Sequence, residues 1–391
     1  MSGLDAFRTE TREWLSENCP VSMRTPMLAA DSDSASHDAK LWFERMTARG
    51  WTCPTWPEEY GGGGLSDDEA TVLSEELARM SARPAMMNTG GTKMLGPVIL
   101  EFGNDEQKRR FLPRIARGEI RWCQGYSEPG AGSDLAGLQT GAVLEGDEYV
   151  INGSKIWTSG ADSADWIFCL VRTDPDAPKH DGISFILFDM KTPGVEVHPI
   201  RLISGVSPFC QTFFTDVRVP RSNLVGTPNE GWTIAKRLLQ FERSMTAELG
   251  MNGAPPAARP SMEDLAKTYQ GETDGRIANP VLRDAIVRHR MNVTALLSTT
   301  RRVEEERALS SGPSATSSMF KYYGTERNKE RNDLLLSIMG TNALGWEGGG
   351  FSSDELTTTR EWLRSRANSI EGGTSEVQLN VISKRVLGLP D

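Results

Sequence analysis

Apolar residues in the first third of the chain recur every three or four positions, which is the spacing of an amphipathic α-helix. The run "SDDE", from Ser66 to Glu69, has the pattern of a capping box, in which a hydroxyl and a carboxylate satisfy the free N–H groups of a helix start. Leu73, Leu77 and Met80 follow it at helical spacing. We therefore expect a helix that begins near Ser66 and buries one face.

A second helix is predicted in the stretch "NDEQKRRFLPRIARG", which opens with Asn104 and Gln107 in the same capping arrangement. Its apolar face is formed by Phe111, Leu112 and Ile115. Gly118 follows this face, where a glycine commonly ends a helix. The first third of the chain is therefore predicted to be a helical domain.

The pattern changes near Trp122 to short β-prone runs separated by turn residues. The stretch "EYVINGSKIW" places two such runs around Asn152-Gly153, and Asn-Gly is a strong hairpin signal because both residues tolerate positive φ. Further runs of strand length follow, namely "DWIFCLVRT", "GISFILFDM", "GVEVHPI" and "QTFFTDVRVP". Several short strands with this punctuation predict an antiparallel barrel or sandwich.

From Pro228 onward the pattern is helical again and predicts long helices at 229–250, 280–309, 314–340 and 375–387, consistent with a bundle. The stretches "NGAPPAARPSMED" and "GETDGRIANP" are interpreted as connectors. A chain of 391 residues exceeds the usual size of one core. We expect an N-terminal α-helical domain at 1–120, a middle β domain at 121–226 and a helical bundle at 227–391.

Composition narrows the function classes. The formal net charge of -10 argues against a nucleic-acid surface, which needs a basic footprint. The first residues lack the basic segment and apolar core of a secretion signal, and the apolar runs are too short to cross a bilayer. The five scattered cysteines lack a Cys-x-x-Cys pair, which favours a reducing, cytoplasmic compartment, and the four histidines show no metal spacing.

The stretch "YSEPGAGSDLAG", which begins at Tyr126, is neither strand-like nor helical, and its glycines indicate unusual backbone or a close approach to something. It lacks the patterns of a P-loop and of a dinucleotide-binding loop. An ordinary tight loop is the alternative. Nearby, Trp157 with the hydroxyls of Thr158 and Ser159 could form a flat wall for a conjugated ring, or the tryptophan could simply pack at a strand end.

The last segment, "SIEGGTSEVQLNVISKRVLGLP", places two glycines before a helix that Thr374 or Ser375 would cap, with Gly388 as a stop. Such a helix start can present N–H groups to an anion or a carbonyl, and a simple terminal helix is the alternative.

Glu242 interrupts an apolar helical face. This face is formed by Trp232, Ala235, Leu238, Leu239, Met245 and Leu249. A carboxylate on an apolar face is costly unless it is paired, so Glu242 is either part of a partly buried ion pair or a general base whose pKa is raised by desolvation.

Together these features resemble the acyl-CoA dehydrogenase family over nearly the whole chain. The matching stretches are "GWTCPTWPEEYGG", "EFGNDEQKRRFLPRIARGE", "WCQGYSEPGAGSDLAGLQT", "VINGSKIWTSGA" and "EGGTSEVQLNVISKRVLGLP". The third and the last are the most specific. The resemblance implies an α+β fold with an N-terminal all-α domain, a middle antiparallel β domain and a C-terminal four-helix bundle. It also implies FAD between the β domain and the bundle.

The resemblance implies roles for particular residues. The family's loop along the flavin is matched by Gln124, Gly125, Tyr126, Ser127, Gly132 and Ser133, of which Ser133 also approaches the acyl-CoA arm. The flavin-stacking wall near flavin N5 is matched by Trp157, Thr158 and Ser159.

Two later segments complete the implied site. A segment that a partner subunit brings to the FAD pyrophosphate is matched by Ser337, Met339, Gly340 and Thr341. The adenosine side is matched by Thr374, Ser375 and Glu376, and Gly373 lies beside the substrate.

The implied reaction is α,β-dehydrogenation of an acyl-CoA, in which a glutamate removes the α proton and the β hydrogen leaves as hydride to flavin N5. Family members carry this glutamate either just before the Gly-Thr of the last motif or on the first bundle helix. Here Gly372 occupies the first position, with Glu371 one residue earlier, and "LLQFERS" matches the second. Glu242 is therefore the expected catalytic base, and Glu371 is the reserve.

The family expectation for partners is an electron-transfer flavoprotein and self-association as a homotetramer or homodimer. The stretch "KTYQGETDGRIANP" lacks the usual Arg-x-x-Phe-Gly pattern, and the segment around Ser337 lacks the usual glutamine. Some bacterial relatives with such losses work as paired unlike subunits on steroid or other bulky CoA thioesters. A heteromer and a role in fatty acid or steroid catabolism follow as expectations. The alternatives are a flavoprotein oxidase or monooxygenase, or a non-catalytic partner subunit.

Overall fold

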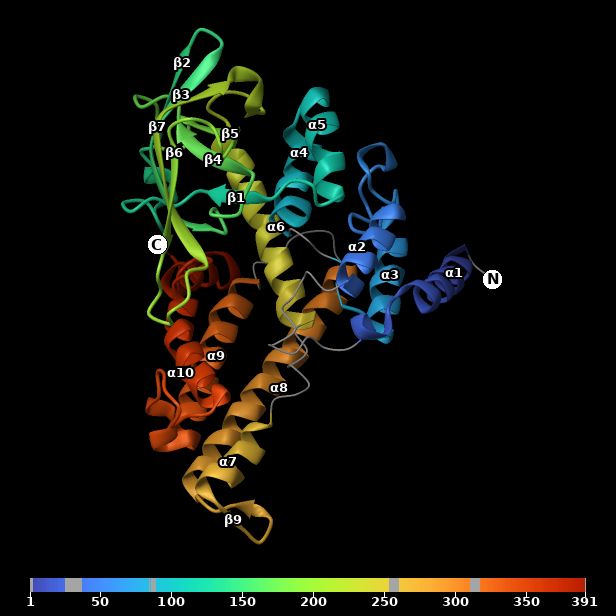
Figure 1. Cartoon of the computed structure of the whole chain (residues 1–391), viewed down its shortest axis with the longest axis vertical. Helices are drawn as coiled ribbons and strands as arrows, with labels where there is room; N and C mark the ends of the chain where they lie inside the picture. Colours follow the sequence, from blue (N-terminus) through green and yellow to red (C-terminus); the bar gives the residue numbers. More distant parts are fainter. Residues whose placement is uncertain are drawn as a thin grey trace. The chain divides into compact units, whose positions relative to one another are not determined.

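The computed structural model describes residues 3–24, 37–83, 85, 89–252, 260–309 and 317–390, without the side chains of 243–252, 304–309 and 317 (Figure 1). Contacts divide the chain into two compact units. The first comprises Met1–Ile200 and Pro208–Ala258, and the second comprises Arg201–Ser207 and Arg259–Asp391. Among the described residues, no helix is both long and apolar enough to cross a membrane.

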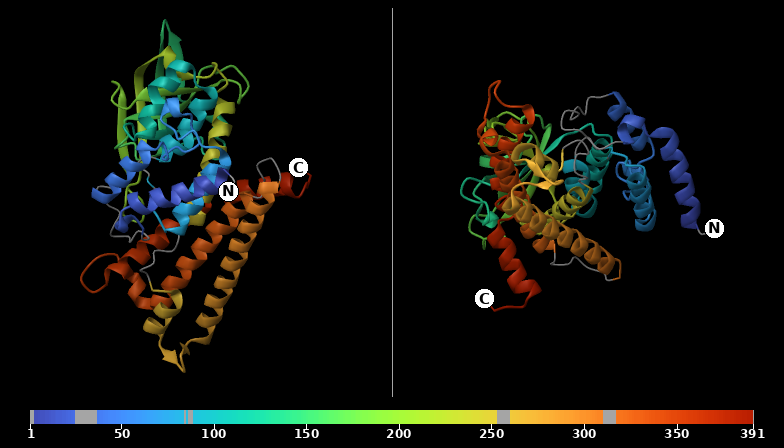
Figure 2. Two further views of the ribbon diagram at one scale, coloured as in Figure 1. Left: turned by 90° about the vertical axis from the view of Figure 1, so that its right-hand side faces the viewer. Right: turned by 90° about the horizontal axis from the view of Figure 1, so that it is seen from below.

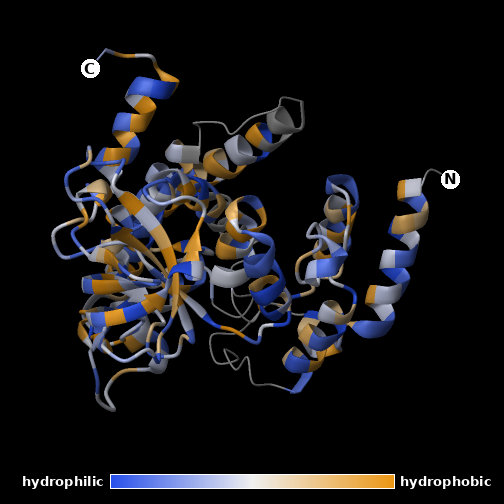
Figure 3. Ribbon diagram, turned by 90° about the horizontal axis from the view of Figure 1, so that it is seen from above, coloured by the Kyte–Doolittle hydropathy of each residue, from blue (hydrophilic) through white to orange (hydrophobic). Residues whose placement is uncertain are grey.

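The first unit begins with helices, as predicted. They are α1 (Gly3–Asn18), α2 (His37–Ala48), α3 (Asp67–Arg79), the π-helical turn η4 (Gly90–Leu95), α4 (Gly96–Phe102) and α5 (Asp105–Ala116). Both predicted capping boxes are confirmed: Ser66 caps α3 with Glu69, and Asn104 caps α5 with Gln107. Residues of both polarities alternate along these helices, as expected when only one face is buried (Figure 3).

An eight-stranded sheet follows the helices, in the order β6-β7-β3-β2-β4-β5-β8, with β1 paired to β4. The strands are β1 (Trp122–Gly125), β2 (Gly141–Glu145), β3 (Glu148–Ser159), β4 (Trp166–Arg172), β5 (Ile183–Asp189), β6 (Val195–Ile200), β7 (Phe209–Pro220) and β8 (Leu224–Val225). The pairing is mainly antiparallel, as predicted, but β1 runs parallel to β4.

The predicted hairpin at Asn152-Gly153 is wrong. These residues lie inside the continuous strand β3, at a shift of its register against β7, and the β2–β3 turn is made by Gly146 and Asp147 instead. Asn152 exchanges two hydrogen bonds with Asp216, at 3.0 and 2.9 Å. Tertiary pairing has therefore overridden the local turn preference of Asn-Gly.

Strands β4 and β5 are buried on both faces, with alternate residues in different cores. Phe168, Leu170, Phe185 and Leu187 belong to a core shared with α4, α5 and α6 (Gly231–Asn252). Their neighbours Ile167, Cys169, Ile186 and Phe188 belong to a second core within the sheet. Helix α6 packs on β5, so the helix that carries Glu242 is fixed to the sheet (Figures 1 and 2).

The described residues of the second unit are mostly helical and include one small hairpin. Its elements are α7 (Met262–Gln270), β9 (Glu272–Thr273), β10 (Arg276–Ile277), α8 (Pro280–Leu309), α9 (Ser317–Met339), α10 (Ser353–Ser365) and α11 (Ser375–Val381). The long helices α8 and α9 lie side by side (Figure 2). A core of Ala266, Ile277, Leu282, Ile286, Leu335 and Ile338 joins them to α7.

The helix predicted at 280–309 is present as α8, and the helix predicted at 314–340 is present as α9; residues 310–316 between them lie outside the described residues. Two helices were missed. Helix α7 begins inside a stretch interpreted as a connector, and α10 begins after a capping box of Ser352 and Glu355. The second expected connector folds as the β9–β10 hairpin.

Candidate active site

The loop that follows β1 is held by a buried ion pair. Lys155 on β3 is fully buried, and its Nζ donates to Glu128 Oε1 at 2.8 Å and to the carbonyl of Tyr126 at 3.1 Å. Glu128 also accepts hydrogen bonds from the backbone N–H groups of Gln139 and Thr140, at 2.7 and 2.9 Å. Burial opposes ionisation of Glu128, but Lys155 and these donors together lower the pKa of its carboxyl.

The same loop is joined to the strand that carries the predicted aromatic wall. The N–H of Ile156 donates to the carbonyl of Ser127 at 2.8 Å. Ser127 and Gln124 are partly exposed, and Gly132 and Ser133 are exposed. A Cβ added to Gly132 would meet no atom within 4 Å, so packing within the chain does not require glycine there. The backbone at Gly132 is therefore open to solvent on this side.

Trp157 lies on the surface in a strained conformation. Its φ is +61°, and its side chain is 52% exposed at a shift in the register of β3 against β7. A non-glycine residue in this region costs of order 1–3 kcal/mol and tends to be found at functional sites. Next to it, the Thr158 hydroxyl is fully buried and has no hydrogen-bond partner among the described residues, whereas Ser159 is exposed.

Glu242 lies on α6, one turn after the fully buried Leu238, and its Oε2 atom is enclosed. The pKa of the Tyr126 phenol is raised, first by burial and then by the negative charge of Glu242, so the two side chains interact electrostatically. The side chains of Met245 and Leu249, expected on the same face, lie outside the described set. The structure therefore brings Glu242 into the neighbourhood of the Tyr126 loop.

Glu371, the reserve base, has a different environment in the second unit. Its carboxylate pairs with Arg364 at 2.7 Å and accepts a hydrogen bond from Asn368 at 2.6 Å. The side chain is 40% exposed. A carboxylate that is partly solvated and held by an arginine is poorly suited to taking a proton from carbon in a dry site.

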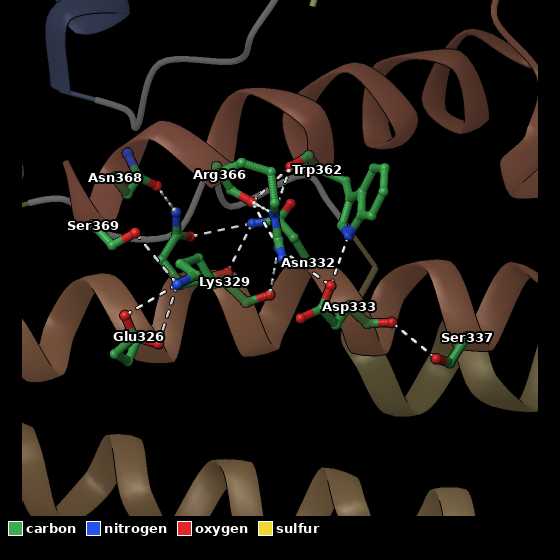
Figure 4. A network of polar contacts seen from close by, with 11 residues as sticks. Glu326, Lys329, Asn332, Asp333, Ser337, Trp362, Arg366, Asn368 and Ser369 are labelled. Carbon is green, nitrogen blue, oxygen red and sulfur yellow. Dashed lines mark hydrogen bonds and ion pairs between the residues drawn. The ribbon is translucent and has the colours of Figure 1, made fainter. Parts of the chain in front are cut away.

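The segment before Glu371 is tied to α9 by a polar network (Figure 4). Asp333 accepts from the Trp362 indole at 2.6 Å and pairs with Arg366 at 3.2 Å. Lys329 donates to Ser369 at 3.4 Å. These contacts fix the residues that lead into the last glycine-rich motif.

The other candidates of the second unit lie at two helix ends. Ser337 and Met339 are in the last turn of α9, with Met339 buried, and Gly340 and Thr341 follow at the surface. As predicted, α11 is capped by Thr374, whose hydroxyl accepts from Val377 N–H at 3.2 Å.

Around this cap, Gly373 has a φ of +90°, and Ser375 is buried while Glu376 is exposed. Hydrogen bonds from its own N–H and from Thr374 lower the pKa of Glu376. The candidate residues thus form two groups, one in each unit.

Sequence reasoning did not assign a role to Glu128 or Lys155, although both lie inside the quoted motifs. A lysine in a β-prone run gives little signal, because its burial depends on an ion pair formed 27 residues away. No group of metal-ligating residues is found in the described ranges, and all five cysteines are free and buried.

Comparison with known proteins covers the whole chain. Family models described as the N-terminal, middle and C-terminal domains of acyl-CoA dehydrogenase match residues 3–119, 123–217 and 229–387. Acyl-CoA dehydrogenase IpdE1 of Mycobacterium tuberculosis is 36% identical over 394 residues, covering 100% of this chain and 99% of that protein. The human mitochondrial short-chain specific acyl-CoA dehydrogenase is 28% identical, covering 97% of this chain and 90% of that protein.

Solved structures also match the whole chain. The ChsE4-ChsE5 complex from Mycobacterium tuberculosis superimposes with a TM-score of 0.72 at 31% identity, covering 100% of this chain and 98% of that one. The steroid acyl-CoA dehydrogenase Tcur3481-Tcur3483 gives a TM-score of 0.73, also at 31% identity, with the same coverage. The expected fold class is confirmed, and the chain belongs to the acyl-CoA dehydrogenase family of flavoproteins, oxidoreductases that act on acyl-CoA.

Proposed function

We propose that the chain binds FAD and removes one hydrogen from each of the α and β carbons of an acyl-CoA thioester, giving a 2-enoyl-CoA. The observation that carries the proposal is a grouping within the first unit. The glycine-rich loop is hydrogen-bonded to the strand that carries a strained, exposed tryptophan and a buried hydroxyl without a described partner, and its Tyr126 interacts with a glutamate that has one enclosed oxygen. This combination suits a flat conjugated ring and a proton acceptor beside it.

The residues of the first unit fit FAD. Trp157 offers an aromatic face, and the Thr158 hydroxyl is a donor that lacks a described partner. Ser127, Gly132 and Ser133 lie on the same loop, where the glycine leaves the backbone open to close approach. FAD, when bound, supplies the acceptor for the β hydrogen.

Glu242 is the proposed base. It lies on the face of α6 that packs into the core of the sheet, and one of its oxygens is enclosed, so a carboxylate is available next to the Tyr126 loop. The proton from the α carbon moves to this carboxylate. Glu371 is the less suitable candidate because it is exposed and engaged with Arg364.

We further propose that Ser337, Met339, Gly340 and Thr341, with Thr374, Ser375 and Glu376, complete an FAD site in an oligomer. Solved relatives named as two-part complexes, one of them a steroid acyl-CoA dehydrogenase, support a heteromer with a related subunit and a bulky or steroid thioester substrate. A homotetramer or homodimer is the alternative. An electron-transfer flavoprotein is the proposed electron acceptor, and the buried free thiols suit a reducing, cytoplasmic compartment.

An anaerobic assay tests the proposal. The protein is purified alone and after co-expression with a related acyl-CoA dehydrogenase subunit from the same genome. Each preparation is expected to carry FAD. Addition of the right CoA thioester should bleach the flavin absorbance band at about 450 nm. Linear, branched and steroid-bearing thioesters are compared. A folded protein that stays colourless in both preparations after FAD is added would contradict the proposal. Rapid reoxidation by air would indicate an oxidase.

A further inference from the structure

Tyr126 carries a buried hydroxyl whose presence packing does not explain. The side chain is 4% exposed, and its ring packs edge-on against Phe168 and Phe185, with centroids 6.1 and 6.4 Å away. The hydroxyl has no hydrogen-bond partner among the described residues. Burying such a group without a partner is unfavourable, and a phenylalanine of the same shape would avoid that penalty.

The position of this hydroxyl indicates its use. Tyr126 belongs to the same buried core as Ala235 and Leu238 of α6, and Glu242 follows Leu238 by one helical turn. Glu242 Oε2 is enclosed, and the charge of this carboxylate acts on the phenol. The backbone of Tyr126 is fixed from the other side, where its carbonyl accepts from Lys155 at 3.1 Å. The backbone of Tyr126 is thus anchored to the ion pair, and its phenol lies in the core onto which the helix of the proposed base packs.

We propose that Tyr126 is a positioning residue whose hydroxyl donates a hydrogen bond to the Glu242 carboxylate when substrate closes the site. Hydrogen bonds of this kind are often long in the free enzyme and tighten in the substrate complex. The inference rests on the proposed function, in which Glu242 is the base. The phenol keeps its proton throughout, and the α proton of the substrate goes to Glu242.

The expected effect is on the ionised form of the base. A donor stabilises the carboxylate anion, so removal of the Tyr126 hydroxyl should make Glu242 harder to ionise. Burial, and then the charge of Glu242, raise the pKa of the Tyr126 phenol, which therefore remains a donor over the working pH range. The base would stay ionised and correctly oriented near neutral pH.

Other charges around α6 have to be considered in a pH experiment. Helix α6 packs against β5, η4 and α4. These elements carry Asp189, Lys93 and Glu101, and Glu101 is paired with Arg237 of α6 at 2.7 Å. Near the phenol, burial raises the pKa of the Cys169 thiol to about 12, so this group stays neutral. Tyr126→Phe changes none of these groups and removes only the hydroxyl.

The test follows anaerobic flavin reduction by acyl-CoA in single-turnover experiments between pH 5 and 9, a range chosen because it spans about two units on each side of neutrality. Tyr126→Phe is expected to keep FAD and to be at least as stable as the wild type. In a plot of the flavin-reduction rate against pH, the fall in rate on the acid side, the acid limb, should occur at a pH about one unit higher than in the wild type. At acidic pH the variant should therefore be about tenfold slower, and at high pH it should recover the wild-type rate. A merely structural defect would not be recovered by raising the pH.

Two further proteins complete the series. Site-specific 3-fluorotyrosine at position 126 keeps the hydroxyl but makes it a stronger donor, so the limb should move to lower pH. Tyr149→Phe is the matched control, since Tyr149 is a buried tyrosine of β3 in the other core of the sheet. Its pH profile should coincide with that of the wild type.

The outcomes separate the two levels of the proposal. If Glu242→Gln reduces flavin normally, the base assignment and the role of Tyr126 both fail. If Glu242→Gln is inactive but Tyr126→Phe and the fluorinated protein keep the wild-type profile, only the role of Tyr126 is overturned. Opposite shifts of the limb in these two proteins support it.

Discussion

At the scale of single residues, buried polar groups of the first unit are of two kinds. Glu128 and Lys155 satisfy each other and nearby backbone groups, so they hold the loop without any other molecule. The hydroxyls of Tyr126 and Thr158 have no partner among the described residues. Buried polar atoms are nearly always paired in finished sites. The first kind builds the scaffold. The second kind is not confined to the proposed site, since enclosed polar atoms without a described partner also occur in Thr11, Thr47, Trp122 and Thr212. Tyr126 and Thr158 are singled out by their place on the candidate loop and strand.

The base assignment gives the first prediction. Glu242→Gln should retain FAD and still bind acyl-CoA, yet reduce flavin at least about a hundredfold more slowly, because a positioned proton acceptor contributes about 10²–10⁴-fold. Glu371→Gln is the matched control and should lose far less, since Glu371 is exposed and paired with Arg364. Stopped-flow reduction of both variants decides between them. A normal Glu242→Gln beside an inactive Glu371→Gln would reverse the assignment.

A second prediction concerns Glu76, which is 1% exposed on α3. A hydrogen bond from Arg12, aided by Arg79, lowers the pKa of Glu76 from 4.5 to about 2. Because the folded-state pKa is the lower one, this stabilisation is complete above about pH 4.5 and is lost as the pH falls toward 2. Glu76→Gln should lower the free energy of unfolding by about 2–3 kcal/mol at pH 7.

Urea unfolding at several pH values measures the difference in free energy of unfolding between the wild type and Glu76→Gln. This difference should shrink below pH 4.5, which is the ordinary pKa of a glutamate side chain. Glu75→Gln provides the control, because Glu75 is 53% exposed and its pair with Arg8 should contribute little. An equal penalty for Glu76→Gln at neutral and acidic pH would show that charge is not the cause.

At the scale of helices and strands, the sequence predicted what depends on neighbours along the chain. Capping boxes at Ser66 and Asn104 need only three residues of spacing, and both are present. The same "S-x-x-E" pattern at Ser352 marks α10, which was overlooked although the signal was available. The position of Glu242 on a helix face also followed from spacing alone, and the structure encloses one of its oxygens.

What the sequence could not show depends on contacts between distant strands. The hairpin predicted at Asn152-Gly153 is wrong because the local turn preference is outweighed by pairing with β7, where Asn152 bonds to Asp216. The burial of Lys155 and the positive φ of Trp157 likewise arise from tertiary packing. Local preference is a weak guide wherever a strand must fit two neighbours at once.

The irregularity of β3 gives the third prediction. Gly153 has a φ of +144°, and an added Cβ would lie 2.7 Å from Thr140 Cα, so Gly153→Ala should lower the free energy of unfolding by about 2 kcal/mol or more. Gly146→Ala in the β2–β3 turn is the control. Gly146 has a φ of +63° with no atom within 4 Å of an added Cβ, and it should cost only about 1 kcal/mol. Equal losses in thermal unfolding would argue that the close approach to Thr140 relaxes freely.

At the scale of the whole molecule, the residues proposed for FAD are divided between two units. The loop, Trp157 and Glu242 belong to the first, and the segments near Ser337 and Thr374 belong to the second. The second unit also exposes large apolar side chains. Those near its end are Leu379, Val386, Leu387 and Leu389, between 44% and 63% exposed. Three of these, Val386, Leu387 and Leu389, lie within four residues of one another, and contiguous exposed apolar surface is typical of a face that another chain covers.

The last prediction is that the active form is an oligomer that uses this end of the chain. Leu387 and Leu389 are 63% and 52% exposed, so replacing both by glutamate should cost little within the chain but should place charge in an apolar interface. We expect Leu387→Glu with Leu389→Glu to form smaller species in sedimentation velocity and to release FAD on dilution. Val143→Glu with Leu144→Glu is the matched control, since these neighbours are 65% and 42% exposed on β2, and it should retain size and flavin. A wild-type monomer that is saturated with FAD and fully active would contradict the prediction. If the size changes while FAD and activity are retained, the interface is real but the flavin site is complete within one chain, and the proposed contribution of Ser337 and its neighbours to a partner's site is wrong.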